Sequence, residues 1–216
     1  MVKCERTFPA PPSLAKRQSY NEEDTIQQLK KIFNDKCYIC ELQGLQDGIP
    51  EHLIPHKENV DLKFDWENLF WACNRCNSIK NRGEYEGKIL DCCKFDPELH
   101  LNFIYAPYEG TIIVKPKDTA ETSQKTAQLI NEVFNLENTG LRISSCRERM
   151  RSFREEWNRF IKLLTEYKKN RTQISFRKIK ARLSTKTAFA AFKRNYIRIN
   201  QSEYKEFQEF VTLNPE

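Results

Sequence analysis

The spacing of apolar residues predicts one helix near the start of the chain and several more in its second half. In the first helix, apolar residues recur every three or four positions: Ile26, Leu29, Ile32 and Phe33. Asn21 suits the N-cap, and the three carboxylates that follow it complement the helix dipole. The sequence therefore predicts a helix from Asn21 to about Asn34.

Four further groups of apolar residues follow residue 119 at helical spacing. They are Ala127, Ile130, Val133, Phe134 and Leu136, ended by Asn138-Thr139-Gly140; Cys146, Met150, Phe153, Trp157, Phe160, Ile161 and Leu164; Phe189, Phe192, Tyr196 and Ile199; and Tyr204, Phe207, Phe210 and Val211. Such stripes are typical of the core-facing side of amphipathic helices. We therefore interpret these aromatic residues as core and not as base-stacking platforms.

The remaining segments predict extended structure. Residues 102–108 and 111–114, with Glu109-Gly110 between them, predict a β-hairpin. Residues 1–19 hold three of the nine prolines and should run as an extended arm. We expect the arm to lie across the body or to dock on another chain, with Phe8 as its anchor, and the alternative is a flexible leader. Together these patterns predict an α+β fold that is mainly helical.

Four of the eight cysteines form two C-x-x-C pairs, Cys37 with Cys40 and Cys73 with Cys76. Two residues between cysteines let both thiolates of a pair reach one ion from a tight turn, and two pairs complete a tetrahedral zinc site. Because the pairs are 32 residues apart, the zinc would position whatever lies in the loop between them.

That loop and the residues after it contain side chains suited to catalysis. Glu51-His52 and His56 lie in the loop, Asn68-Leu69 precedes the second pair, and Asn77 and Lys80 follow Cys76. This order resembles the zinc-containing HNH endonuclease family, whose signature is C-x-x-C, an acidic residue and His, Asn-Leu, then C-x-x-C with His or Asn and a Lys three residues later. The match covers about one fifth of the chain.

The resemblance implies a zinc-bound ββα-metal core with defined catalytic roles. His52 would be the general base that deprotonates water, Glu51 and Asn77 would hold the catalytic cation, and Asn68 would brace the loop bearing His52. Adjacent side chains on a regular strand point to opposite faces, so Glu51 and His52 can share a site only if the strand is twisted or bent.

Three further residues near this site have open assignments. Lys80 and Arg82 suit phosphate contacts, although Lys80 equally suits a solvated helix position. His56 suits either a contact to metal or substrate, or a structural hydrogen bond.

Two departures from the family signature bear on the choice of catalytic metal. Glu51 replaces the usual Asp, and Asn77 replaces the usual His. Both keep an oxygen donor, which favours Mg²⁺ or Mn²⁺ over Zn²⁺ or Ni²⁺ at the reactive site.

The net charge of +6 is unevenly distributed. Residues 37–96 carry 7 Lys/Arg and 11 Asp/Glu, whereas residues 142–198 carry 18 Lys/Arg and 4 Asp/Glu. A basic segment of that strength suits phosphate backbones, and the alternative is a set of solvated helix faces.

The remaining cysteines and the N-terminus indicate the compartment. The absence of an 18-residue apolar run and of an apolar signal core predicts a cytoplasmic protein with reduced thiols. The remaining cysteines are Cys4, Cys92, Cys93 and Cys146. The adjacent Cys92 and Cys93 suit buried packing better than support of the zinc site.

The resemblance extends beyond the core. Arg-Thr-Phe-Pro-Ala-Pro, Glu-His-Leu-Ile-Pro-His-Lys, Phe-Asp-Trp-Glu-Asn-Leu-Phe and Asp-Cys-Cys are similar to the PtuB family of HNH subunits in Septu and retron-associated anti-phage systems. That similarity implies a PtuA-like ATPase partner, and a retron reverse transcriptase with its nucleic acid as a further partner. No membrane partner is expected.

We therefore predict three parts: an arm and lead-in helix (1–36), an HNH core with a Cys4 zinc site (37–100), and a hairpin followed by a basic helical region (101–216). The predicted function is metal-dependent endonuclease activity, with DNA favoured over RNA such as tRNA as the substrate. The alternative is a zinc-stabilised binding module for nucleic acid or protein whose catalytic site has decayed.

Overall fold

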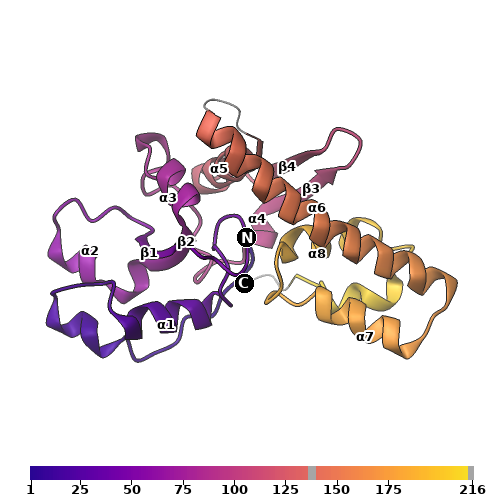
Figure 1. Cartoon of the computed structure of the whole chain (residues 1–216), viewed down its shortest axis with the longest axis horizontal. Helices are drawn as coiled ribbons and strands as arrows, with labels where there is room; N and C mark the ends of the chain where they lie inside the picture. Colours follow the sequence, from indigo (N-terminus) through magenta and orange to yellow (C-terminus); the bar gives the residue numbers. More distant parts are fainter. Residues whose placement is uncertain (136–139, 214–216) are drawn as a thin grey trace.

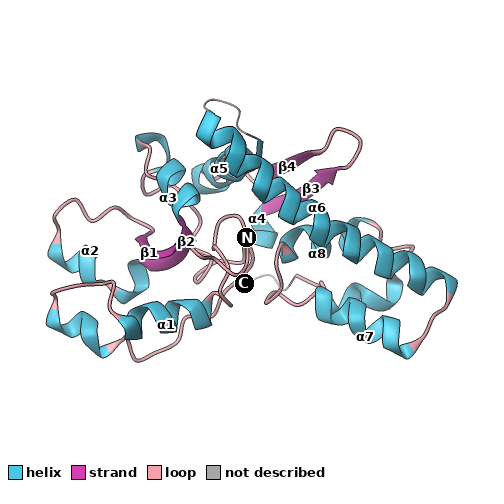
Figure 2. Ribbon diagram, in the orientation of Figure 1, coloured by secondary structure: helices cyan, strands magenta, loops and turns pink. Residues whose placement is uncertain are grey.

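The computed structural model describes residues 1–135 and 140–213, and it confirms a mainly helical α+β fold with two small sheets (Figures 1 and 2). The first half contains η1 (Pro12–Lys16), α1 (Glu23–Ile32), β1 (Gly48–His52), α2 (Val60–Phe64), η2 (Trp66–Asn68), β2 (Leu69–Cys73), α3 (Asn74–Lys80) and η3 (Gly83–Tyr85). The second half contains α4 (Pro97–His100), β3 (Leu101–Ala106), β4 (Thr111–Pro116), α5 (Glu121–Asn135), α6 (Gly140–Lys169), α7 (Gln173–Arg182), α8 (Ala190–Ile199) and η4 (Lys205–Phe210).

The first sheet joins the two halves of the cysteine loop. Strands β1 and β2 pair antiparallel, with Glu51 opposite Phe70 and His52 opposite Leu69. A side chain at Gly48 would collide with the indole of Trp71, because its Cβ would lie 2.2 Å from the ring. Gly48 thus permits the close approach of the two strands, and α3 follows β2 without a loop.

The second sheet is the predicted hairpin, β3 and β4, which is confirmed with Ile104 opposite Ile113. Helix α5 packs beside it, and its Asn131 side chain bonds both backbone groups of Val114, at 2.8 Å each. The predicted end of this helix at residues 138–139 lies outside the described residues.

Two hydrophobic cores lie along α6, which crosses the molecule diagonally in Figure 1. The larger core includes Phe134, Phe153, Phe189 and Phe192, and the smaller includes Phe160, Leu164, Ile179 and Phe207. The prediction that the aromatic stripes are core is confirmed for these residues. It is wrong for Ile199, which is 62% exposed.

The N-terminal arm is held by residues other than the predicted anchor. Phe8 is 64% exposed, so it does not anchor the arm to the body of this chain, and its role in docking on another chain stays a prediction. The guanidinium of Arg6 lies over the rings of Trp66 and Phe70, at 5.1 and 4.9 Å, and donates to the carbonyl of Trp66. Buried Val2, Cys4 and Leu14 complete the attachment.

Helix boundaries also differ from the predictions. The N-cap of α1 is Glu22, one residue after the predicted Asn21. Among the described helices, none combines the length and the apolar character that crossing a membrane requires.

Buried ion pairs fix the C-terminal helices. Glu98, which is 1% exposed, accepts from Arg194 at 2.7 Å and Arg198 at 2.5 Å, both on α8. Glu156 of α6 accepts from Arg182 of α7 and Lys193 of α8. Glu98 therefore connects α8 to α4, and Glu156 connects α6 to both α7 and α8.

Replacing Glu98 by Ala should lower the free energy of unfolding by about 3–5 kcal/mol, because it leaves the buried Arg194 cation uncompensated. Glu203→Ala is the matched control: its pair with Lys168 is half exposed and should contribute less than about 1 kcal/mol. Urea denaturation of both variants measures the difference, and equal losses would contradict the prediction.

The stabilising effect of Glu156 should depend on pH. Burial opposes its charge, but hydrogen bonds and ion pairs to Lys193 and Arg182 lower its pKa below the ordinary 4.5. A carboxyl whose pKa is depressed by folding stabilises above its unfolded pKa and loses that effect as the pH falls through its folded pKa. The stability gap between wild type and Glu156→Gln should thus be constant above about pH 5 and close below pH 4.5. Urea unfolding from pH 3 to 7 tests this, and a gap that widens on acidification would contradict it.

Candidate metal centre and active-site pocket

Two turns bring the four motif cysteines together. Cys37 and Cys40 lie in the turn after α1, Cys73 ends β2, and Cys76 lies in the first turn of α3. All four are buried, and their Sγ atoms lie within 4.8 Å of one another. Tetrahedral Zn–S bonds of about 2.3 Å require sulfur–sulfur distances of about 3.8 Å, so the donor set fits one zinc ion.

A buried arginine supports anionic sulfur at this cluster. Arg149 of α6 is 4% exposed and has no carboxylate partner among the described residues; its side chain contacts Cys73 Sγ and the Val133 carbonyl, both at 3.4 Å. Burial opposes its charge, but the Cys40, Cys76 and Cys73 thiolates raise its pKa well above the ordinary value. Zinc bound to four thiolates carries a net charge of −2, which would compensate this cation.

Cys4, Cys92 and Cys93 do not belong to the four-cysteine cluster. The Cys4 amide donates to the Cys92 carbonyl at 2.9 Å, and Cys93 Sγ accepts from Arg6 at 3.6 Å. Cys92 is fully buried, as expected for a packing residue.

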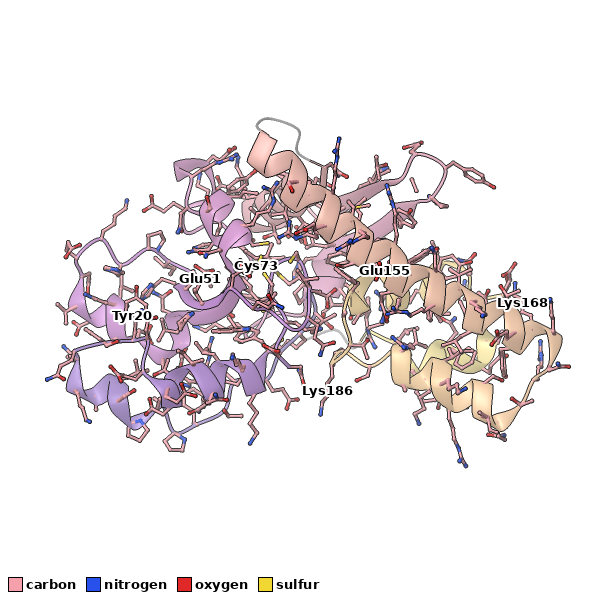
Figure 3. All side chains as sticks on the ribbon, viewed as in Figure 1. Tyr20, Glu51, Cys73, Glu155, Lys168 and Lys186 are labelled. Atoms are coloured by element: carbon pink, nitrogen blue, oxygen red, sulfur yellow. The ribbon has the colours of Figure 1, made fainter. Side chains whose placement is uncertain are left out.

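A pocket of about 660 Å³ opens on the other side of β1. It is lined chiefly by Tyr20, Asn21, Glu51, His52, His56, Lys57, Asn77, Asn81 and Glu86. The structure thus brings together four of the residues that the sequence singled out: Glu51, His52, His56 and Asn77. In the view of Figure 3, Glu51 lies between Tyr20 and the sulfur cluster at Cys73.

His52 is held in one orientation by its neighbours. Its Nε2 lies 3.0 Å from the carbonyl of Lys63, and its ring meets Tyr20 edge-on at 4.7 Å and His56 at 4.8 Å. A carbonyl can only accept, so Nε2 carries the proton and Nδ1 has the free lone pair. Burial lowers the pKa of His52 below its ordinary 6.5, which favours the neutral imidazole.

Glu51 lies deeper than His52. Its carboxylate accepts from the Tyr38 hydroxyl and pairs with Lys80 Nζ at 3.2 Å, and the residue is 3% exposed. Burial raises its pKa although Lys80 and Tyr38 act in the opposite direction. Its Oε2 is the oxygen that lies 3.2 Å from Lys80 Nζ, and it has no further partner among the described residues, so it keeps acceptor capacity for a second ligand.

Lys80 lies neither in the pocket, where a phosphate contact was predicted, nor in solvent, where the alternative placed it. The side chain is 1% exposed, and its ammonium donates to the carbonyls of His52 and Leu53 while pairing with Glu51. Lys80 does not line the pocket. It ties α3 to the end of β1 and balances the charge of the buried Glu51.

Asn68 connects the two ends of the His52 loop. Its Oδ1 accepts from the Ile54 amide at 2.8 Å, and its Nδ2 donates to the carbonyls of Ile54 and Leu62 at 2.8 and 3.1 Å. It is buried and does not line the pocket. These contacts position the loop and do not reach the space beside His52.

Asn77 and Arg82 have different surroundings. Asn77 lines the pocket, where its Oδ1 accepts from Asn81 Nδ2 at 2.9 Å. Arg82 pairs instead with Glu132 of α5 and does not line the pocket. Its guanidinium therefore contacts a carboxylate outside the site where a phosphate would bind.

Sequence reasoning missed Tyr20, Asn81 and Arg149. Tyr20 precedes the first helix and carries no motif. Asn81 lies four residues after Asn77, one helical turn further along. Arg149 had a signal, because it is a lone cation beside Met150 on the apolar side of a predicted helix.

The protein should contain one zinc ion per chain, and Cys73→Ser should lose it. Removing one thiolate breaks the tetrahedral set and leaves Arg149 facing a weaker anion, so the variant should also unfold at lower urea. Metal analysis of purified protein measures zinc, with Cys93→Ser, outside the cluster, as the matched control. Full zinc content in Cys73→Ser would contradict the assignment.

Comparison with known proteins gives one distant relationship. The chain is 28% identical to the Septu protein PtuB of Bacillus mycoides strain KBAB4, over an alignment of 145 positions that includes 52% of this chain and 48% of that protein. The chain thus spans about half the length of that relative. No family model and no solved structure matches the chain. This protein is therefore distantly similar to a Septu PtuB protein and contains a buried four-cysteine cluster suited to zinc.

Proposed function

We propose that the pocket beside β1 is the active site of a metal-dependent HNH endonuclease that hydrolyses phosphodiester bonds. The observation that carries this proposal is His52, a buried neutral imidazole whose Nε2 is held by the Lys63 carbonyl. The arrangement of β1, β2 and α3 around four cysteines supports assignment to a ββα-metal core.

The residues fit a hard divalent cation such as Mg²⁺ or Mn²⁺. Glu51 Oε2 is buried with Lys80 Nζ as its one partner among the described residues, and the Asn77 side chain lines the same pocket. Carboxylate and amide oxygens are the ligands such cations prefer. When bound, the cation would neutralise charge on the phosphoryl oxygens and stabilise the leaving oxygen.

The proposed proton transfer begins at His52. Its Nδ1 takes a proton from water, while the Lys63 carbonyl stabilises the Nε2–H of the imidazolium that results. Tyr20 and His56 restrict rotation of the ring. Lys80 favours the ionised form of Glu51 against the effect of burial, and it holds the carbonyl of His52, so it acts as a positioning residue.

We further propose that the protein acts in an anti-phage complex in the bacterial cytoplasm, with a PtuA-like ATPase as its partner. Similarity to a Septu PtuB protein supports this, as do the longer sequence stretches that resemble PtuB subunits. A retron reverse transcriptase with its nucleic acid is a further candidate partner. DNA is the favoured substrate, with RNA such as tRNA as the alternative.

One observation favours a second function, a zinc-stabilised binding module without catalysis. Glu51 already has Lys80 and Tyr38 as partners, so a cation must compete with the Lys80 charge for its carboxylate. Weak cation binding that depends on substrate phosphate is compatible with catalysis. Complete exclusion of the cation would leave only binding.

Replacing His52 by Ala should reduce cleavage by about 100-fold or more, because it removes the general base. The assay incubates purified chain with plasmid DNA or total RNA in Mg²⁺ or Mn²⁺, with and without a candidate ATPase partner. His100→Ala is the matched control, since His100 pairs with Asp118 outside the pocket.

The outcomes separate the two functions. Metal-dependent cleavage by wild type and His100→Ala, but not by zinc-loaded His52→Ala, supports the nuclease and identifies its polymer. Absence of cleavage in every condition, with zinc bound, supports the binding module.

A further inference from the structure

Helix α6 exposes a row of basic residues along one side. The row consists of residues three or four positions apart, and all of them are exposed: Arg147, Arg151, Arg154, Asn158, Lys162, Thr165 and Lys169. Because all steps between them are of three or four residues, the positions follow the helical turn and form a single line. At about 1.5 Å per residue this line is about 33 Å long.

The row contains no acidic residue, and few protein groups neutralise it. Arg147, Arg151 and Lys169 make no ion pair with another described residue, and Lys162 meets Glu166 only at 4.0 Å on the exposed surface. Arg154 donates to the Gly110 carbonyl at 3.1 Å. Like charges four residues apart destabilise a helix by about 0.2–0.5 kcal/mol, so the row opposes helix stability.

The opposite side of α6 fixes the direction of the row. Phe153, Phe160 and Leu164 are at most 1% exposed and pack in the two cores. Arg149, one turn from Phe153, contacts the cysteine cluster. The helix therefore cannot rotate its basic row toward the interior, and the charges stay on a rigid element.

We propose that this α6 basic row (Arg147, Arg151, Arg154, Lys162 and Lys169) binds the phosphate backbone of a nucleic acid at a surface separate from the His52 pocket. The inference rests on the proposed function, because nucleic acid is the proposed substrate. The length of the row is close to one turn of duplex, about 34 Å. Asn158 and Thr165, the two uncharged members, are also side chains that donate to phosphate.

The composition of the row favours nucleic acid over an acidic protein. Protein interfaces are centred on buried aromatic or aliphatic anchors, and the row has none. Its near end adjoins α3, the helix that carries Asn77, since Arg75 of α3 donates to Cys146 Sγ at 2.8 Å. Its far end lies toward Lys168, remote from Glu51 and Tyr20 (Figure 3). A polymer on the row can thus extend well beyond the pocket.

The test measures binding without cleavage. A variant with Arg147, Arg151, Lys162 and Lys169 all changed to Gln is compared with wild type by fluorescence anisotropy on a 20-bp DNA duplex and a 20-nucleotide RNA. No Mg²⁺ or Mn²⁺ is added, and salt is varied. Affinity for at least one polymer should fall by about tenfold or more, and the slope of log K against log salt should shrink by up to about four.

The matched control removes four exposed lysines elsewhere: Lys16, Lys31, Lys115 and Lys205, each changed to Gln. It has the same net charge as the row variant and should bind nearly as wild type does. Equal losses in both variants, an unchanged row variant, or no binding by wild type would each overturn the proposal.

His52→Ala distinguishes this inference from the proposed catalysis. It should bind with wild-type affinity and salt dependence while failing to cleave. If wild type binds nucleic acid through the row but never cleaves it, the nuclease proposal fails and the proposed binding by the row is supported. If wild type cleaves and the row variant binds nucleic acid as wild type does, the proposed binding by the row is overturned and the nuclease proposal is supported.

Discussion

The contact of a buried arginine with a cluster of four buried thiols joins the parts of this protein. The thiols come from the turn after α1, the end of β2 and the start of α3, so one ion would hold three elements in register. Arg149 adds a fourth element, α6, whose buried guanidinium contacts Cys73 Sγ. Sulfur anions and the arginine depend on each other, because neither is stable alone in a site closed to water.

Compensation of buried charge also organises the residues of the pocket beside β1. Glu51 and His52 are neighbours in the chain, yet Glu51 is neutralised by Lys80 within the protein, whereas His52 keeps a nitrogen free beside the pocket. Lys80 also bonds the His52 carbonyl, so the cation that balances Glu51 also fixes the backbone under the imidazole. Lys80 therefore has two roles: it stabilises the backbone at His52, and it would compete with a metal cation for the Glu51 carboxylate.

Helix α6 connects these features to the second half of the molecule. Its buried sides contact the cysteine cluster and both hydrophobic cores, and its solvent side carries basic residues over about 33 Å. Buried Glu156 and Glu98 then attach α8 to α6 and to α4. The basic segment is thus a folded surface of defined shape and not a loose tail.

The sequence by itself determined the features that rest on local spacing. The two C-x-x-C pairs predicted the cluster, helical periodicity predicted the core faces of α5, α6 and α8, and the hairpin followed from its turn. Tertiary structure alone decided the partners of individual side chains. Lys80 is buried because Glu51 lies across from it, Arg6 and not Phe8 contacts Trp66 and Phe70, and Arg149 contacts a thiol instead of solvent. Spacing along a chain fixes which face of an element a residue occupies, but the charge or ring opposite that face belongs to a distant segment.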